Sequence, residues 1–310
     1  EIARYMEESE YEREINELGS RHSGVDLIEY SLNRNLAKHF DDLLEFSEGQ
    51  MYDLIARYLR KFDAWNVKTV LRGVYSGAGR DSIETDLIRA GEFDESFLDR
   101  LLEASTIEDV VTTLDGTIFG DPLAAAFEDF EETDVLVPLE NAVDRIFYEE
   151  LLAELPSSEA IDLYREFLEA EIDFRNARNA LRLARSGADI DPAEYFIEGG
   201  RLFDARELEG LIQSPDQLVS AIRDSSYGRE LSEPLDELEN ANSLITFEHA
   251  LESVLLKYSR RLGNVYPLSI CPVVAYILMK EREVENIRAI ARGREAGLSE
   301  AEIEQELVIL

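Results

Sequence analysis

The sequence predicts an all-α protein made of three related helical modules. Two observations lead to this fold class. Apolar residues recur at helical spacing along the whole chain, whereas sustained alternation of apolar and polar residues, the pattern of exposed strands, does not occur. One pattern of about ten residues also appears three times at equal spacing. A solenoid would need a much shorter period of roughly 20 to 50 residues, so we expect large modules that close on one another.

The repeated pattern lies on the second long helix that we expect in each module. Its copies are Asp63–Arg72, Asp173–Arg182 and Glu283–Arg292, at successive offsets of 110 residues. Each copy has an acid, an Asn three residues later, a base two residues after the Asn and an Arg four residues further on. The apolar residues between them predict one buried stripe on a 3.6-residue helix, with the Arg residues near its edge. The repeated polar positions are Asn66, Arg72, Asn176, Arg182, Asn286 and Arg292.

The sequence on both sides of this pattern repeats as well. Upstream of each copy we expect a long amphipathic helix. Its apolar anchors are Leu32 and Leu36, Leu139 and Val143, and Leu251 and Leu255. Downstream, a capped short helix is expected from Ser105 and again from Ser214, and a small residue closes each patterned helix. The closing residues are Gly73 or Gly77, Gly187, and Gly293 or Gly297.

The two ends of the chain together supply the third module. Residues 1–11 align with residues 109–119, so the N-terminal residues supply the part of the third module that is missing after the C-terminal residues. We therefore expect the modules to close as a pseudo-threefold body with a central hollow. The chain begins at Glu1 in what reads as mid-helix, and roughly 17 residues of the third module have no counterpart. We therefore expect a truncated N-terminus and a third module that is the least complete and most mobile. The predicted modules are residues 25–133, residues 134–242, and residues 243–310 joined to residues 1–24.

The repeated arginines Arg72, Arg182 and Arg292 allow two interpretations. They could face a common partner along the threefold axis, since all three hold the same position in the repeat. More often a buried Arg pairs with an acid of its own module, for which Asp63 and Glu283 are candidates. We favour the structural interpretation and keep the partner-facing one open.

The chain is very acidic and poor in lysine. It carries 67 Asp and Glu against 31 Lys and Arg, a net charge of −36, and only five of its basic residues are Lys. The acids are spread between apolar residues rather than gathered in a tail. An acidic interaction surface and adaptation to high salt are both possible sources, and we favour the second because concentrated salt screens the repulsion within a few ångströms. In either case we expect no binding to nucleic acid, since no stripe of Lys and Arg could outweigh the negative electrostatic potential of so acidic a chain.

Motifs for cofactors are absent from the sequence. The three histidines lack ligand partners at helical spacing, so we expect no metal site. The glycine-rich run Gly73–Gly79 is not followed by Lys and Ser or Thr, and it reads as a helix end rather than a phosphate loop. Cys271 reads as a small buried hydrophobe. We therefore expect no cofactor and no small-molecule substrate.

The strongest enzyme-like pattern is the acidic group Asp41, Asp42 and Glu45. Carboxylates at this helical spacing can hold Mg²⁺. In so acidic a chain such a triplet also arises by chance, and no second motif accompanies it. A solvated helix end is the better interpretation.

The most apolar stretch of the chain is Val265–Met279. It is short, contains Pro267 and Pro272, and ends in charged residues. A bilayer span needs about 20 apolar residues, so this stretch predicts a buried helix.

The same C-terminal region carries a resemblance to a known family. Asn264–Leu278 and the charged segment Lys280–Arg288 follow the pattern Pro-Leu-Ser/Gly-x-x-Pro, an apolar helix, and Lys-Glu-x-Glu-x-x-Asn-Ile/Leu-Arg. This resembles the C subunit of the archaeal A-type (A/V-type) ATP synthase, which is related to the d subunit of vacuolar ATPases. The weaker copies of the pattern extend the resemblance over the whole chain. Cys271 departs from it, because a small residue such as Gly is usual there.

The resemblance implies a role as well as a fold. It implies a closed, funnel-like body of three similar domains, whose base sits on the membrane proteolipid (K/c) ring and whose hollow receives the D and F subunits of the central shaft. The protein would then be a peripheral, non-catalytic rotor subunit at the cytoplasmic face of the membrane. The alternatives are a free-standing helical scaffold and, less favoured, a helical enzyme that uses the acidic group of Asp41.

Overall fold

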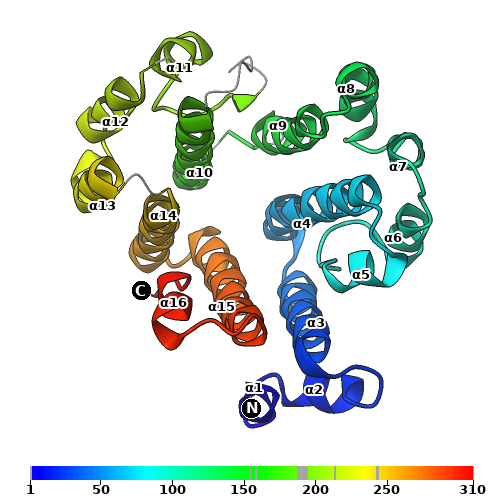
Figure 1. Ribbon diagram of the computed structural model, residues 1–310. Helices are drawn as coiled ribbons and strands as arrows, with labels where there is room; N and C mark the ends of the chain where they lie inside the picture. The colour runs from blue at the N-terminus through cyan, green and yellow to red at the C-terminus, as the bar shows by residue number, and fades with distance from the viewer. Residues whose placement is uncertain are drawn as a thin grey trace. The chain divides into compact units, whose positions relative to one another are not determined.

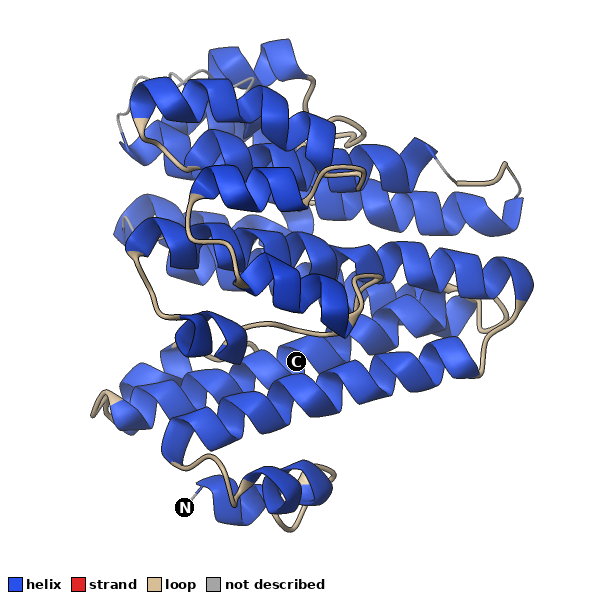
Figure 2. Ribbon diagram, turned by 90° about the vertical axis from the view of Figure 1, so that its right-hand side faces the viewer, coloured by secondary structure: helices blue, strands red, loops and turns tan. Residues whose placement is uncertain are grey.

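The computed structural model describes residues 2–153, 155–157, 159–186, 195–212, 214–241 and 244–309. Across these ranges the secondary structure consists of helices joined by loops, with no strand among the described residues (Figure 2). The predicted all-α fold class is therefore confirmed.

Two long helices followed by shorter ones recur along the chain, and we group the described helices by this recurrence. The first series is α3 (Gly24–Glu45), α4 (Gly49–Ser76), α5 (Arg80–Thr85), α6 (Glu95–Leu102), α7 (Ile107–Thr113) and α8 (Gly120–Thr133). The second is α9 (Val137–Ala153), α10 (Glu159–Ser186), α11 (Ala205–Ile212), α12 (Pro215–Asp224) and α13 (Gly228–Ala241). The third is α14 (Ile245–Val265), α15 (Cys271–Glu295) and α16 (Glu300–Gln305), which the repeat predicts to be completed by α1 (Ile2–Met6) and α2 (Glu12–Leu18) at the other end of the chain. Each series begins with two long helices, and the repeated sequence pattern lies on the second of them.

The chain forms two compact units. The first unit comprises residues 1–147 and 277–306, and the second comprises residues 148–276 and 307–310. The division passes through α9 and α15, so these two helices each contribute to both units. The module boundaries expected from the repeat remain a prediction.

Helix α4 is central to the first unit and packs on α3, α5 and α7. Its inward face is large and apolar, and Tyr58, Leu59 and Phe62 are all buried. The ring of Phe62 meets that of Phe40 on α3 at a centroid distance of 5.3 Å. Burial of one such side chain contributes about 1.5–3 kcal/mol, which explains why the apolar stripe seen in the sequence faces inward.

Helix α10 has the same place in the second unit, where α11, α12 and α14 pack on it and α13 packs on α12 and α14 (Figure 1). Its Phe174, Ala177 and Leu181 are buried in one cluster with residues of all four helices. The cluster includes Leu208, Leu218, Leu231 and Leu251, one from each of these helices. The alanine at position 177 lets the neighbouring helices approach closely without leaving a void.

The two short helices expected downstream of the first and second repeats begin differently. Thr106 caps α7 in a reciprocal capping box with Asp109, as expected for the helix downstream of the first repeat. Ser214 occupies the N-cap of α12, but its side chain makes no capping hydrogen bond. Pro215 follows it at the first helical position and has no N–H to satisfy.

Glycines act at the ends of the long helices and also inside them. Gly77 caps α4 with a left-handed φ of 71°, and Gly297 lies just beyond α15 with a φ of 76°. Gly73 lies within α4, where a Cβ would overlap the side chain of Ile83 on α5. Gly293 has the same relation to Ile303 on α16, at 2.7 Å from Cγ1. The expected closing position Gly187 lies outside the described residues.

The sequence predicted one buried helix for the apolar run Val265–Met279, and this prediction is wrong. Helix α14 ends at Val265, and α15 starts at Cys271. The intervening turn exposes Leu268 almost completely, at 99%. Pro267 cannot donate the backbone hydrogen bond that a continuous helix requires, so the helix breaks there.

Candidate functional site

The repeated asparagines Asn66 and Asn176 fix a loop to each long helix. The Asn66 side chain donates to Ile88 O at 2.8 Å and accepts from Ile88 N at 2.9 Å. Asn176 makes the same pair of bonds with Ile197, at 2.8 and 3.0 Å. Both asparagines are buried, so each one satisfies a buried backbone N–H and C=O that would otherwise be costly. Asn286 is half-buried at the corresponding position of α15.

The acids three residues before Asn66 and Asn176 each accept two further backbone bonds from the same loop. Asp63 accepts from the N–H of Glu92 at 2.7 Å and from that of Phe93 at 3.1 Å. Burial nevertheless raises the pKa of the Asp63 carboxyl to about 7. Removal of the group from water outweighs these two hydrogen bonds.

Asp173 repeats this arrangement in the second unit. It accepts from the N–H of Arg201 and of Leu202, both at 2.7 Å. Burial raises the pKa of this carboxyl as well. Glycine precedes the donors in both units, and a Cβ on Gly91 or Gly200 would overlap the carboxylate it faces.

A tyrosine just before a helix reaches the acid in two of the three copies, Tyr227 before α13 and Tyr11 before α2. The Tyr227 hydroxyl donates to Asp173 Oδ2 at 2.9 Å, and the Tyr11 hydroxyl donates to Glu283 Oε1 at 2.6 Å. Tyr11 aligns with Phe119, which has no hydroxyl. Burial, followed by the adjacent carboxylates, raises the pKa of both tyrosines above the ordinary value. The N-terminal segment therefore gives Glu283 a tyrosine hydroxyl as hydrogen-bond donor, as the segment just before α13 does for Asp173.

Lys280 anchors the N-terminal segment further. It is buried on α15, and its Nζ lies 2.8 Å from Glu10 Oε1, 3.0 Å from the Tyr11 hydroxyl and 3.2 Å from Glu283 Oε1. The hydrogen bond and charge of Lys280 lower the pKa of Glu10, although burial opposes them. These contacts supply the partners that a buried ammonium requires.

The repeated arginines each reach a glutamate near the start of another series of helices. Arg72 on α4 forms an ion pair with Glu140 on α9. Arg182 on α10 binds both carboxylate oxygens of Glu248 on α14, at 2.6 and 2.7 Å. The hydrogen bond that Arg182 donates to Glu248 raises the pKa of Arg182.

Arg292 completes the set within the first unit. It lies on α15 and contacts Glu29 on α3 at 2.6 Å and Asp86 at 2.9 Å. Glu29 is only 2% exposed and also accepts from Arg288 Nε at 2.6 Å. Two guanidinium groups thus compensate one buried carboxylate.

These partners differ from the ones that the sequence suggested. Asp63 and Glu283 were the expected acids, but Asp63 binds backbone N–H groups and Glu283 binds Tyr11 and Lys280. The arginines instead join the second long helix of one series to the first long helix of the next. Two lysines add similar links, Lys68 to Asp144 at 2.6 Å and Lys61 to Glu281 at 2.9 Å.

Sequence reasoning missed the glutamates, although a signal for them exists. The three glutamates recur near the start of α3, α9 and α14, at offsets of 111 and 108 residues. The small irregularity hides them from a search at one fixed period. The missed residues are Glu29, Glu140, Glu248, Gly91, Gly200, Tyr11 and Tyr227.

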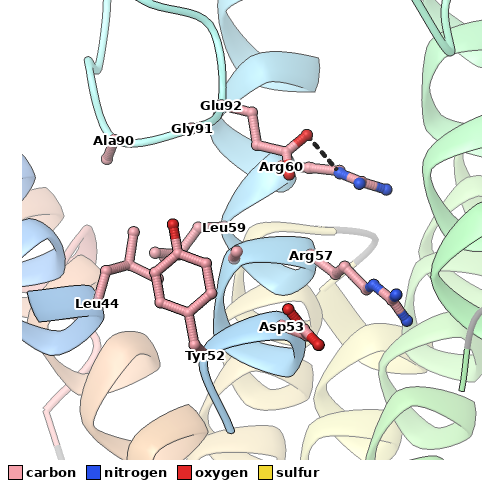
Figure 3. A pocket seen from close by; sticks show the side chains of 10 residues that line it. Leu44, Tyr52, Asp53, Arg57, Leu59, Arg60, Ala90, Gly91 and Glu92 are labelled. Carbon is pink, nitrogen blue, oxygen red and sulfur yellow. Dashed lines mark hydrogen bonds and ion pairs between the residues drawn. The ribbon is translucent and has the colours of Figure 1, made fainter. Parts of the chain in front are cut away.

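One groove of about 530 Å³ opens beside the first half of α4 (Figure 3). The ring of Tyr52 lies between Leu44 and Leu59, and Asp53 and Arg57 stand along the same side of the helix. An ion pair of 2.7 Å between Arg60 and Glu92 closes one end. Charges of both signs line the groove, so it does not select for an ion of either sign.

The acidic group Asp41, Asp42 and Glu45 lies at the C-terminal end of α3, near the surface. Among the described residues no set of three or more His, Cys, Asp or Glu side chains is placed to hold a metal ion. No helix in the described part of the chain has the length and apolar character to cross a bilayer.

Comparison with known proteins extends over the whole chain. Residues 1–306 match the family described as ATP synthase (C/AC39) subunit. The C subunit of the A-type ATP synthase of Haloferax volcanii is 69% identical over 310 residues, which is 100% of this chain and 89% of that protein. The same subunit of Halobacterium salinarum is 62% identical, with 100% and 89% covered. That of Methanococcoides burtonii is 36% identical, with 100% and 86% covered. The chain therefore belongs to the family of A-type ATP synthase C subunits.

Proposed function

We propose that this chain is a non-catalytic subunit of the rotor of an A-type ATP synthase. It sits in the central stalk at the cytoplasmic face of the membrane, as a peripheral protein. It joins the membrane proteolipid ring to the D and F subunits of the central shaft, and so couples proton or sodium flow to ATP synthesis or hydrolysis elsewhere. No nucleic acid, cofactor or small-molecule substrate takes part.

The observation that carries the proposal is the set of three Arg–Glu pairs. Arg72 links the first predicted module to the second, Arg182 links the second to the third, and Arg292 links the third back to the first. Links in this cyclic order support three modules closed around an axis, as in a funnel. A closed ring resists twist better than an open array, because no module has a free end.

Coupling of this kind needs rigidity and matched surfaces rather than catalytic groups. Side chains that fix loops to the long helices, such as Asn66 and Asn176, supply rigidity. Membership of the family supports a place in the A-type ATP synthase. The ion pairs between the helices support a rigid body, which a rotor subunit needs.

Binding of purified partners tests the proposal. The chain, a D–F shaft complex and a detergent-solubilised proteolipid ring are mixed pairwise in concentrated salt, and association is measured by analytical ultracentrifugation. We expect the chain to bind both partners and to show no ATPase activity alone. Binding to neither partner, or an ATPase activity of the isolated chain, would contradict it. A chain that remains free of synthase subunits in native membranes would instead be the free-standing scaffold.

A further inference from the structure

The carboxyl group of Asp63 lies under the loop between α5 and α6, within the first unit. Asp63 is only 2% exposed, and its two oxygens accept from the N–H groups of Glu92 and Phe93. Gly91 comes just before these donors, and a Cβ on it would overlap the carboxyl group. The place of residues 91–93 therefore depends on how well this one buried side chain is satisfied.

The first copy of the repeat lacks a hydroxyl group that the other two copies direct at the acid. Tyr11 at the N-cap of α2 and Tyr227 just before α13 each donate a hydrogen bond to the acid of the repeated pattern. Phe119 occupies the same place at the N-cap of α8, and it is buried. Its ring packs edge-on against that of Phe93, with 6.0 Å between the centroids. Phenylalanine thus fills this position beside the loop without supplying the donor that tyrosine supplies elsewhere.

The charged side chains that act most strongly on Asp63 do not take the place of that hydroxyl. The pKa of the Asp63 carboxyl is raised to about 7, mainly by burial and in smaller part by Glu92, while the two N–H groups and Arg60 lower it. Glu92 and Arg60 form an ion pair of 2.7 Å with one another (Figure 3), so their opposite charges largely cancel at Asp63. An ionised Asp63 would therefore be a buried charge that depends on two backbone donors.

We propose that Asp63 is a proton-operated latch, which holds the loop between α5 and α6 closed on α4 when it carries a proton and lets the loop open when it ionises. A buried carboxylate costs much free energy unless further donors or water reach it. Where a tyrosine supplies the third donor, the loop can stay in place. Beside Asp63 the extra donor has to be water, and water reaches the carboxylate when residues 91–93 move away.

The groove beside α4 gives water a path to this side chain. Ala90, Gly91 and Glu92 of the loop line the groove (Figure 3), and the N–H of Glu92 is one of the two that Asp63 holds. The ion pair between Arg60 and Glu92 closes one end of the groove, so movement of Glu92 would break it. Opening of the loop would thus join the groove to the space around Asp63.

The response of the latch to pH has a definite sign. Because the pKa of Asp63 in the folded chain is raised above its ordinary value, the closed loop is favoured at low pH and is lost as pH rises through about 7. The second unit should respond less, because burial raises the pKa of Asp173 but the hydrogen bond from Tyr227 opposes it. The latch makes the stiffness of the first unit depend on proton concentration, and it acts in the single chain whether or not the proposed rotor role is correct.

The single tryptophan of the chain reports on this loop. Trp65 lies two residues after Asp63 on α4, and its Nε1 donates to Asp86 O at 3.1 Å, at the start of the loop. Tryptophan emission of the purified chain is measured between about pH 5 and 9 in concentrated KCl. We expect a sigmoidal change centred near pH 7 in the parent and none in Asp63→Asn. The matched control Asp86→Asn should titrate like the parent, because it keeps the backbone carbonyl and the buried acid.

The variant Phe119→Tyr tests the missing hydroxyl directly. It supplies the donor that Tyr11 and Tyr227 supply in the other copies. A hydrogen bond to the charged form favours ionisation, so the midpoint of the emission change should move down by about one to two pH units. A flat emission curve in the parent, a titration that persists in Asp63→Asn, or an unmoved midpoint in Phe119→Tyr would overturn the proposal.

Hydrogen exchange of backbone amides gives a readout that needs no substitution. Protection of the Glu92 and Phe93 amides, each expressed relative to the exchange rate of an unfolded chain, should fall about tenfold between about pH 6 and 8. The amides of Arg201 and Leu202, which donate to Asp173, serve as the internal control and should lose less protection. Unchanged or rising protection at Glu92 and Phe93 would mean that the carboxylate holds the loop at least as well as the acid, and the latch would be wrong.

Discussion

Replacement of Gly200 by alanine tests whether the loop after α10 is fixed by Asp173. A Cβ at position 200 would overlap the Asp173 carboxylate, which is 1% exposed and accepts from the N–H groups of Arg201 and Leu202. Displacement of the carboxylate breaks both bonds. Each hydrogen bond to a charged group contributes about 1.5–3 kcal/mol, so we expect the loss of two to lower the free energy of unfolding of Gly200→Ala by about 3–6 kcal/mol.

The control for this experiment is Gly210→Ala. Gly210 lies within α11 with open space around the position of a Cβ. Alanine is the better helix former, so this variant should gain about 0.5–1 kcal/mol. Urea unfolding of both variants and the parent in concentrated KCl, followed by circular dichroism, gives the free energies. A loss below about 1 kcal/mol for Gly200→Ala would refute the reasoning, because it would mean that the loop shifts freely and the bonds are not needed.

Three further outcomes follow from the same structure. Substitution of Arg182 and Glu248 by alanine, singly and together, should give a coupling energy of about 1 kcal/mol in a double-mutant cycle of unfolding; a coupling near zero would contradict the bidentate pair. Gly73→Ala should cost about 1–3 kcal/mol in a denaturant titration, because its Cβ would overlap Ile83. The same substitution should cost less when it is made in an Ile83→Ala background, and a neutral Gly73→Ala would show that α5 is not packed closely on α4. The carboxyl of Asp63 has a pKa of about 7 in the folded chain and about 4 in the unfolded one, so the folded state holds the extra proton between these values and stability falls as pH rises from 4 to 7. Against the reference Asp63→Asn, the parent should lose up to about 4 kcal/mol over this interval in urea titrations, and parallel curves would exclude the raised pKa.

The sequence allowed the fold class and the repeated polar positions to be predicted. Helical spacing identified the long helices, and three equally spaced copies pointed to positions such as Asn66 and Asn176, whose side chains make equivalent bonds. Local periodicity suffices here because each Asn bonds to a loop of its own repeat, about 22 residues away.

Contacts between distant helices were harder to predict. Arg182 reaches Glu248 across 66 residues, and nothing in the local pattern prefers that acid in a chain so rich in carboxylates.

The exposed turn at Leu268 was missed for another reason. Its apolar composition indicated burial, and the break imposed by Pro267 received too little weight. An exposed apolar turn departs from the packing rule, and such departures are expected at functional surfaces.

The position of this chain in the intact synthase tests the rotor assignment most directly. Electron cryomicroscopy of the complex from native membranes, with a small rigid tag fused to the chain, would locate it. The account predicts density for the chain on the central axis, between the proteolipid ring and the shaft, in every rotational state. Density on a peripheral stalk, or at a fixed position beside the catalytic head, would contradict it.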